Sequence, residues 1–344
     1  MAQPAQRPRR RRWYALGAGV CAVLVAVVGV LVVTRGDEPV DMVRDYLSAL
    51  REGRLDAALR AANVDGLPTG EQAGLLDAAT LRGGWRVGSL EAESTSRESP
   101  VVVRVTLLDD ADHPTVARSG EGRFTVVRDG GDWRIENPFH EVTFADSALG
   151  YIEINGFTRP RGKHPYLLFP GIYQPYAAAN GAVTVAAPPL VALPGQHTRR
   201  PYVVEVRVTA AGNRSYQALS DIFFDGCAAA RGCGFTPLGD YYRVPGGVVR
   251  SDKATGVRAT IVRRPEVNLP GVMSGGSGLF GQVTVPGEVR LTGRGAPAGG
   301  NWTAAFAQTC LIRQTPLVAT IAADGTITTN WTGDSALRAV VSCY

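Results

Sequence analysis

The feature that most constrains this chain is an apolar run over residues 13–33, directly behind a block of arginines. The run contains no charged residue and no proline. A helix rises about 1.5 Å per residue, so about 20 apolar residues cross a hydrocarbon core of about 30 Å. The sequence therefore predicts a transmembrane helix over residues 13–34, with a basic tail (residues 1–12) before it and the bulk of the chain after it.

The charges on either side of the run set its expected orientation. Arginines crowd its N-terminal side, whereas Arg35 alone precedes Asp37 and Glu38 on the other side. Basic residues flanking a membrane helix stay in the cytoplasm. We therefore expect a single-pass plasma-membrane protein with a cytoplasmic N-terminus and an extracytoplasmic remainder.

Three other interpretations of the run are less favoured. A cleaved signal peptide has a shorter apolar core and a small-residue cleavage site, whereas this run ends in Val33, Thr34 and Arg35. Arg11 and Arg12 resemble a twin-arginine signal, but the arginine block explains them equally well. Cys21 precedes most of the apolar residues, the wrong order for a lipidation site. An uncleaved signal-anchor fits best.

Composition predicts a folded, nearly neutral ectodomain. The 344 residues allow two or three domains, and 45% hydrophobic residues against 19% charged ones suffice for packed cores. The net charge of +5 belongs to the tail, because the chain after Arg35 has 30 basic and 31 acidic residues. The tail suits anionic lipid headgroups, and nothing in this balance indicates a nucleic-acid partner.

Residues 38–138 follow the pattern of helices packed on an antiparallel sheet. Residues 40–53 place Val43, Tyr46, Leu47 and Leu50 on one helical face. A second helix is predicted over residues 54–62 and a short third one over 72–81. Alternating apolar residues then predict strands over 85–93, 100–108, 122–127 and 133–137. This region is expected to form an α+β cone.

The helix with YLSALREGR at residues 46–54 and the strand end DWRIENP at 132–138 resemble the nuclear-transport-factor-like or cystatin-like ectodomains of bacteria. Such modules stand just outside a membrane anchor, including ahead of some penicillin-binding proteins. The resemblance implies a fold and no shared chemistry. Enzymatic relatives use an Asp or His in an apolar pocket as a general base, but the pattern places neither His113 nor His140 inside. Both, with His164 and His197, are expected at the surface.

The rest of the chain is predicted to be mainly β. Residues 139–201 contain short apolar segments cut by turn signals, which indicates a small β module or connector. Residues 202–344 begin with an alternating strand over 202–208, followed by a helix over 213–230 with Tyr216, Leu219, Ile222 and Phe223 on one side. A meander is expected over 241–244, 256–262, 282–285, 289–292, 302–308, 317–321, 326–330 and 339–343.

The fold class expected for the whole chain is therefore α+β. It comprises one N-terminal transmembrane helix, a helix-plus-antiparallel-sheet cone, a β-rich region and a C-terminal strand–helix–β-meander domain. The stretch over residues 219–235 resembles uncharacterised actinobacterial single-pass membrane proteins that also carry an N-terminal cone. That resemblance implies no specific function. A preference for arginine over lysine and abundant Ala, Gly, Val and Pro also suit a GC-rich bacterium.

Four cysteines remain once Cys21 is assigned to the bilayer: Cys227, Cys233, Cys310 and Cys343. An extracytoplasmic location favours disulfides. Four cysteines allow three pairings, of which Cys227 with Cys233 and Cys310 with Cys343 is favoured. A catalytic thiol at Cys233 is disfavoured because no histidine is close to it in sequence.

The remaining motifs do not indicate chemistry. The G-x-G-x-x-G at residues 276–281 precedes a strand, whereas a dinucleotide site needs a helix there. The G-x-S-x-G nucleophile motif is not matched around Ser274. The four histidines are too scattered for a metal site. We therefore expect no catalytic residue, no metal and no cofactor.

These observations favour a membrane-anchored extracytoplasmic binding or scaffold protein of the bacterial cell envelope. Its expected partners are the lipid bilayer and other envelope or membrane proteins. The alternative is a small-ligand carrier or pocket enzyme that uses the first cone. A signalling receptor is disfavoured, because a tail of residues 1–12 is too short for an output domain. The lining of the cone would discriminate between the scaffold and the carrier or enzyme. Convergent buried polar groups would favour a carrier or enzyme, and an interior filled by the cone's own side chains would favour the scaffold.

Overall fold

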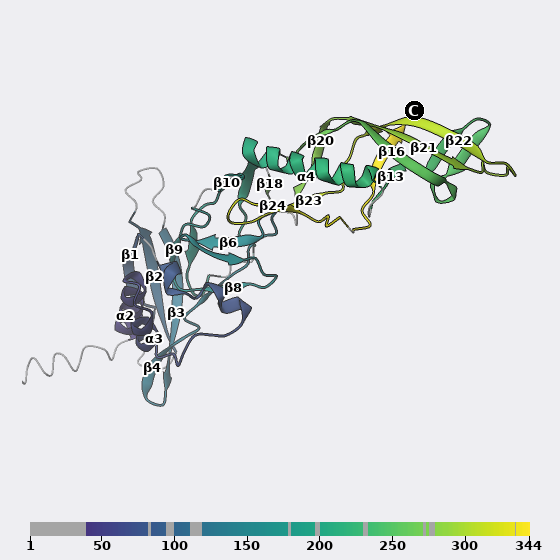
Figure 1. Cartoon of the computed structure of the whole chain (residues 1–344). Helices are drawn as coiled ribbons and strands as arrows, with labels where there is room; N and C mark the ends of the chain where they lie inside the picture. Colours follow the sequence, from purple (N-terminus) through teal and green to yellow (C-terminus); the bar gives the residue numbers. More distant parts are fainter. Residues whose placement is uncertain are drawn as a thin grey trace, which may run out of the picture.

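The computed structural model describes residues 39–81, 84–93, 100–110, 119–177, 180–196, 200–229, 233–270, 273–274, 279–333 and 335–344. The protein is an elongated α+β molecule with few helices and many strands (Figure 1). The predicted tail and membrane helix lie outside these residues, as do His113 and His197. Within the described part, no helix combines the length and hydropathy needed to cross a bilayer.

The N-terminal part packs two helices on a sheet. Helix α2 (Pro39–Arg51) buries Val43, Tyr46, Leu47, Ala49 and Leu50, and α3 (Leu55–Ala61) follows after a short turn. The sheet is antiparallel in the order β1 (Trp85–Ala92), β2 (Val101–Asp109), β3 (Ser119–Asp129) and β4 (Asp132–Glu136). The apolar periodicities of the sequence therefore predict these elements correctly.

A set of short elements follows and connects the two ends of the molecule. The predicted third helix is two 3-10 turns, η1 (Glu71–Leu75) and η2 (Ala78–Leu81). The short strands are β5 (His140–Val142), β6 (Tyr151–Ile154), β7 (Phe157–Pro160), β8 (Tyr166–Leu168), β9 (Gly171–Tyr173), β10 (Val183–Ala186) and β11 (Leu190–Ala192). They pair in hairpins and small sheets.

The C-terminal part is organised around helix α4 (Ala210–Ala228). The Thr209 side chain caps it by accepting a hydrogen bond from the Gly212 N–H at 3.1 Å. Its buried face contains Tyr216, Phe223 and Phe224. The prediction that Ile222 shares the face of Tyr216 and Phe223 is wrong, because Ile222 is 58% exposed. Helical residues i and i+1 lie about 100° apart, so Phe223 and Phe224 can face the core while Ile222 lies outside it.

A five-stranded sheet lies beside the C-terminal half of α4 (Figure 1). Its order is β13 (Phe235–Pro237), β25 (Ala339–Cys343), β22 (Ala304–Ile312), β21 (Gly287–Gly295) and β16 (Thr255–Arg263). Strand β13 is parallel to β25, and the other neighbours are antiparallel. The hairpin of β14 (Tyr241–Val244) and β15 (Gly247–Arg250) packs against β22. The 3-10 turn η3 (Ser251–Lys253) follows β15.

The remaining short strands of the C-terminal part form three small sheets. They are β12 (Glu205–Val208), β17 (Glu266–Asn268), β18 (Met273–Ser274), β19 (Leu279–Phe280), β20 (Gln282–Val285), β23 (Val318–Ile321) and β24 (Ile327–Thr329). Strand β12 pairs with both β10 and β18, so one small sheet joins segments on either side of residue 201.

Candidate functional site

Two disulfides are present in the C-terminal part. Cys227, in the last turn of α4, is bonded to Cys233, with Cα atoms 4.7 Å apart. Cys310 of β22 and Cys343 of β25 are directly opposite each other and bonded, with Cα atoms 3.9 Å apart. These are the two pairs that the sequence favours. Because Cys233 is bonded, it is not a free thiol in this structure.

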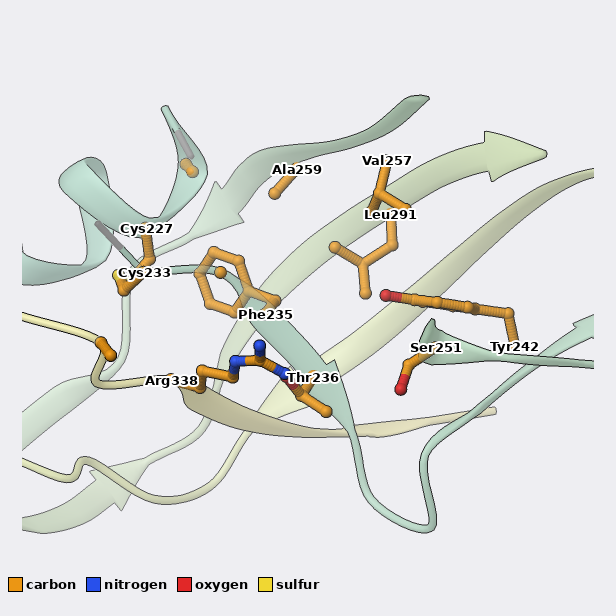
Figure 2. A pocket seen from close by; sticks show the side chains of 13 residues that line it. Cys227, Cys233, Phe235, Thr236, Tyr242, Ser251, Val257, Ala259, Leu291 and Arg338 are labelled. Carbon is orange, nitrogen blue, oxygen red and sulfur yellow. A yellow bond between two sulfur atoms is a disulfide. The ribbon is translucent and has the colours of Figure 1, made fainter. Parts of the chain in front are cut away.

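The Cys227–Cys233 disulfide borders a hollow of about 460 Å³ (Figure 2). The hollow lies between the end of α4, strand β13, the hairpin β14–β15 with its following turn, and the inner side of β16 and β21. Its lining residues are Cys227, Ala228, Cys233, Gly234, Phe235, Thr236, Tyr242, Ser251, Val257, Ala259, Leu291, Ala336 and Arg338.

The hollow exists because α4 and the hairpin cover different ends of the sheet. Phe224 of α4 stacks on Phe235, with ring centroids 6.4 Å apart, and Tyr242 of the hairpin stacks on Phe306 at 4.3 Å. Between these two stacks the inner side of the edge strand is only partly covered. Val257 and Ala259 are accordingly half-buried, whereas Leu291 on the neighbouring strand is fully buried.

The Tyr242 side chain is held firmly and directs its hydroxyl into the hollow. Pairing with Val249 fixes its position in the hairpin, and the Gln308 side-chain amide donates to the carbonyl of the adjacent Arg243 at 2.5 Å. The residue is 3% exposed, and its hydroxyl points between Phe235 and Leu291 (Figure 2). Among the described residues, no hydrogen-bond partner of this hydroxyl is found.

Arg338 supplies the charge of the site. The parallel pairing of β13 with β25, including a hydrogen bond from Ala339 N–H to the Gly234 carbonyl at 3.2 Å, brings it beside β13. Its guanidinium extends toward Thr236 (Figure 2). Burial raises the pKa of the Tyr242 hydroxyl, and the nearby positive charge of Arg338 opposes that rise. Tyr242 is therefore neutral at physiological pH and can donate a hydrogen bond.

A second, more open hollow of about 780 Å³ adjoins the first and shares Ala228 and Ala259 with it. It lies along the edge strand β16. The Asp225 carboxylate and the Arg264 guanidinium border it and form an ion pair at 2.9 Å. The two hollows are therefore neighbours, and the second lies at the open edge of the five-stranded sheet.

The two histidines that the structure describes, His140 and His164, do not form a site. His164 is exposed and lies 3.7 Å from the Glu71 carboxylate. His140 is 3% exposed, so its predicted surface position is wrong. It is buried because β5 pairs with β8, which aligns His140 with Leu168. In the described part of the chain no three His, Cys, Asp or Glu residues are grouped as metal ligands would be.

The interior of the N-terminal cone is filled by its own side chains. Leu47, Phe124 and Ile135 are fully buried there, and Tyr46 packs edge-on against Phe124. The Tyr46 hydroxyl donates to the carbonyl oxygen of Pro138 at 2.8 Å, so this buried polar group is satisfied. These fully buried side chains occupy the interior of the cone.

Four residues that line the hollow were not predicted from the sequence as site residues: Thr236, Tyr242, Ser251 and Arg338. Alternation places Tyr242 inward on its strand, which is the one local signal for any of them. The proximity of Arg338 to Thr236 depends on the pairing of β13 with β25. These strands lie about 100 residues apart in the chain, and nothing in their sequences indicates that they pair.

No protein-family model, curated protein or solved structure matches this chain.

Proposed function

We propose that this chain is a membrane-anchored, extracytoplasmic binding or scaffold protein of the bacterial cell envelope, and that it performs no catalysis. Residues 13–34 serve as its single membrane anchor, with the N-terminus in the cytoplasm. The two disulfides support an oxidising compartment for the remainder of the chain.

One observation carries the binding function: the hollow next to the Cys227–Cys233 disulfide. An apolar wall with a few convergent polar groups is the usual form of a recognition site. The hydroxyl of Tyr242 faces this hollow without a partner in the described part of the chain, and Arg338 adds a positive charge. These groups are available to a bound molecule.

The filled cone supports the scaffold over the alternative of a carrier or enzyme that uses the first cone. A ligand there would have to displace fully buried side chains such as Leu47 and Phe124, at a cost of several kcal/mol. The proposal therefore assigns recognition to the C-terminal part. The cone then acts as a spacer between the membrane and the binding site.

Site-specific crosslinking in cells tests this function. A photoreactive amino acid in place of Thr236, at the hollow, should crosslink to another envelope or membrane protein. The same amino acid in place of Arg290, which lies exposed on the opposite face of β21, is the matched control and should give little product. Equal crosslinking from both positions, or none from Thr236, would contradict a binding function at this surface.

A further inference from the structure

The unpartnered hydroxyl of Tyr242 is the starting point. A hydroxyl that opens into a hollow can donate a hydrogen bond to a molecule bound there, and a phenylalanine would stack on Phe306 equally well. The residue Tyr242 is 3% exposed, but its oxygen faces the hollow, and no hydrogen-bond partner of this oxygen is found among the described residues. A hydroxyl in such a position is suited to donate to a bound acceptor.

The charge of the hollow favours an anionic acceptor. The described lining residues include no aspartate or glutamate, and Arg338 is the one charged side chain among them. Arg250, which precedes Ser251, is paired with Asp252 at 3.0 Å, and Arg264 of the second hollow is paired with Asp225. For Arg338, no carboxylate partner is found in the part of the chain that the structure describes.

We propose that this hollow binds a carboxylate attached to an apolar group, in which Arg338 pairs with the carboxylate and Tyr242 donates a hydrogen bond to it. The inference rests on the proposed binding function and specifies its ligand. The planar guanidinium fork matches a carboxylate in shape. One guanidinium with neutral hydroxyls from Tyr242, Ser251 and Thr236 balances a single negative charge, whereas a phosphate dianion would leave charge unbalanced.

The apolar part of the ligand follows from the opposite wall. Phe235, Val257 and Leu291 present their side chains to the same space (Figure 2). A volume of about 460 Å³ is within the usual range of small-molecule sites. It fits a group of the size of an aromatic or branched side chain beside its carboxylate. Such a ligand is either a free organic acid or the carboxyl terminus of a polypeptide.

The experiment is a calorimetric titration of the full chain with defined ligands. N-acetylphenylalanine offers the carboxylate and ring, and its primary amide is identical except for the charge. A hexapeptide with a free carboxyl-terminal phenylalanine, and the same peptide amidated, represent the polypeptide source. We expect both carboxylates to bind and both amides to bind at least about tenfold more weakly, since a charge-assisted hydrogen bond contributes more than a neutral one.

Variants then locate the binding. Arg338→Gln should weaken carboxylate binding about 10- to 100-fold, and Tyr242→Phe about 3- to 10-fold. Tyr242→Phe should leave the melting temperature unchanged or raised, because the stack on Phe306 remains. The matched controls are Arg290→Gln, on the opposite face of the sheet, and Tyr241→Phe, the exposed neighbour. Both should bind like the unaltered protein.

The source of the carboxylate is decided by comparison. Tighter binding of the hexapeptide than of N-acetylphenylalanine identifies a polypeptide terminus, and equal binding identifies a small acid; either result supports the inference. Amides that bind as well as the acids, tighter binding of phenyl phosphate, or unchanged affinity in Arg338→Gln would overturn it. Absence of carboxylate binding while Thr236 still crosslinks to a partner refutes the ligand alone. Loss of both results refutes the binding function as well.

Discussion

His140 is a buried base with one satisfied and one unsatisfied nitrogen. Its Nδ1 lies 2.9 Å from the carbonyl oxygen of Leu193. Because a carbonyl oxygen only accepts, Nδ1 carries the proton. Nε2 is buried without a partner among the described residues. A proton added to Nε2 would therefore place an unpaired charged N–H in the interior. Burial accordingly lowers the pKa of His140, although the hydrogen bond to Leu193 and the charge of Glu141 oppose this.

The direction of that shift predicts a stability loss in acid. Below about pH 6.5 the unfolded chain protonates this histidine while the folded chain does not, so the unfolded state is favoured. The free energy of unfolding should fall by at most about 1.4 kcal/mol per pH unit until the folded-state pKa is reached. In His140→Asn, which keeps a donor for Leu193 and does not titrate, urea unfolding at pH 7.5 and pH 5.5 should show less of this loss.

The exposed His164 provides the control for this measurement. His164→Asn should retain the acid sensitivity contributed by His140. If His140→Asn lost as much stability as the unaltered protein between the two pH values, the assignment of a neutral, buried imidazole would be wrong.

The sequence predicts a helix or strand correctly where its pattern of apolar residues is local. Strand β2 shows strict alternation and was predicted within a residue of its limits. Helix α2 follows from the spacing of Val43, Tyr46 and Leu50. Strands β7, β9 and β13 have only three or four residues and exist through partners supplied by other segments. The sequence missed these three strands, although it predicted the four-residue strands β14 and β20 at their limits. Short length therefore does not by itself hide a strand; the three that were missed depend on pairing partners that no local pattern indicates.

The candidate site could not be predicted for the same reason, because pairings between distant segments bring its residues together. Each wall of the site comes from a different element. Strands β13 and β25 pair in parallel, so no tight turn joins them and no turn signal in the sequence indicates their contact. Local patterns predicted the strands over residues 241–244 and 289–292, which contain Tyr242 and Leu291, but assigned neither side chain to a site. They could not indicate that Arg338 lies in the same space.

The two disulfides differ in the length of chain that they close, which predicts different effects on stability. Cys310 and Cys343 are separated by 33 positions, whereas Cys227 and Cys233 are separated by 6. A longer closed loop restricts the unfolded chain more. Replacing Cys310 and Cys343 by alanine should cost about 3 to 4 kcal/mol, against about 2 kcal/mol for Cys227 and Cys233.

Urea unfolding of the two double-alanine variants measures this difference. Mass spectrometry after alkylation without reduction should first show that these four cysteines carry no label in the unaltered protein. An equal shift of the unfolding midpoint in both variants would contradict the loop-length argument, and labelling of Cys233 in the native protein would contradict the disulfide itself.

In the whole molecule, apolar contacts cross the expected domain limits. One buried cluster joins Leu149 and Val183 to Tyr216 and Phe306, and a second joins the N-terminal cone to Phe169. The predicted connector over residues 139–201 thus contributes side chains to the cores on both sides of it. Such shared packing favours a stiff elongated body (Figure 1), which suits a spacer that holds a binding site away from a membrane.

If residues 13–34 span the membrane with the N-terminus inside, protease added to intact, wall-stripped cells should degrade nearly the whole chain. A fragment of a few kilodaltons containing the membrane segment should remain, because the bilayer shields a helix of about 20 residues. Immunoblotting with antibodies to the N-terminal tail and to the C-terminal part measures this. Protection of the C-terminal part would refute the orientation. A mature N-terminus near Arg35, found by sequencing the protein from cells, would instead show that the segment is cleaved.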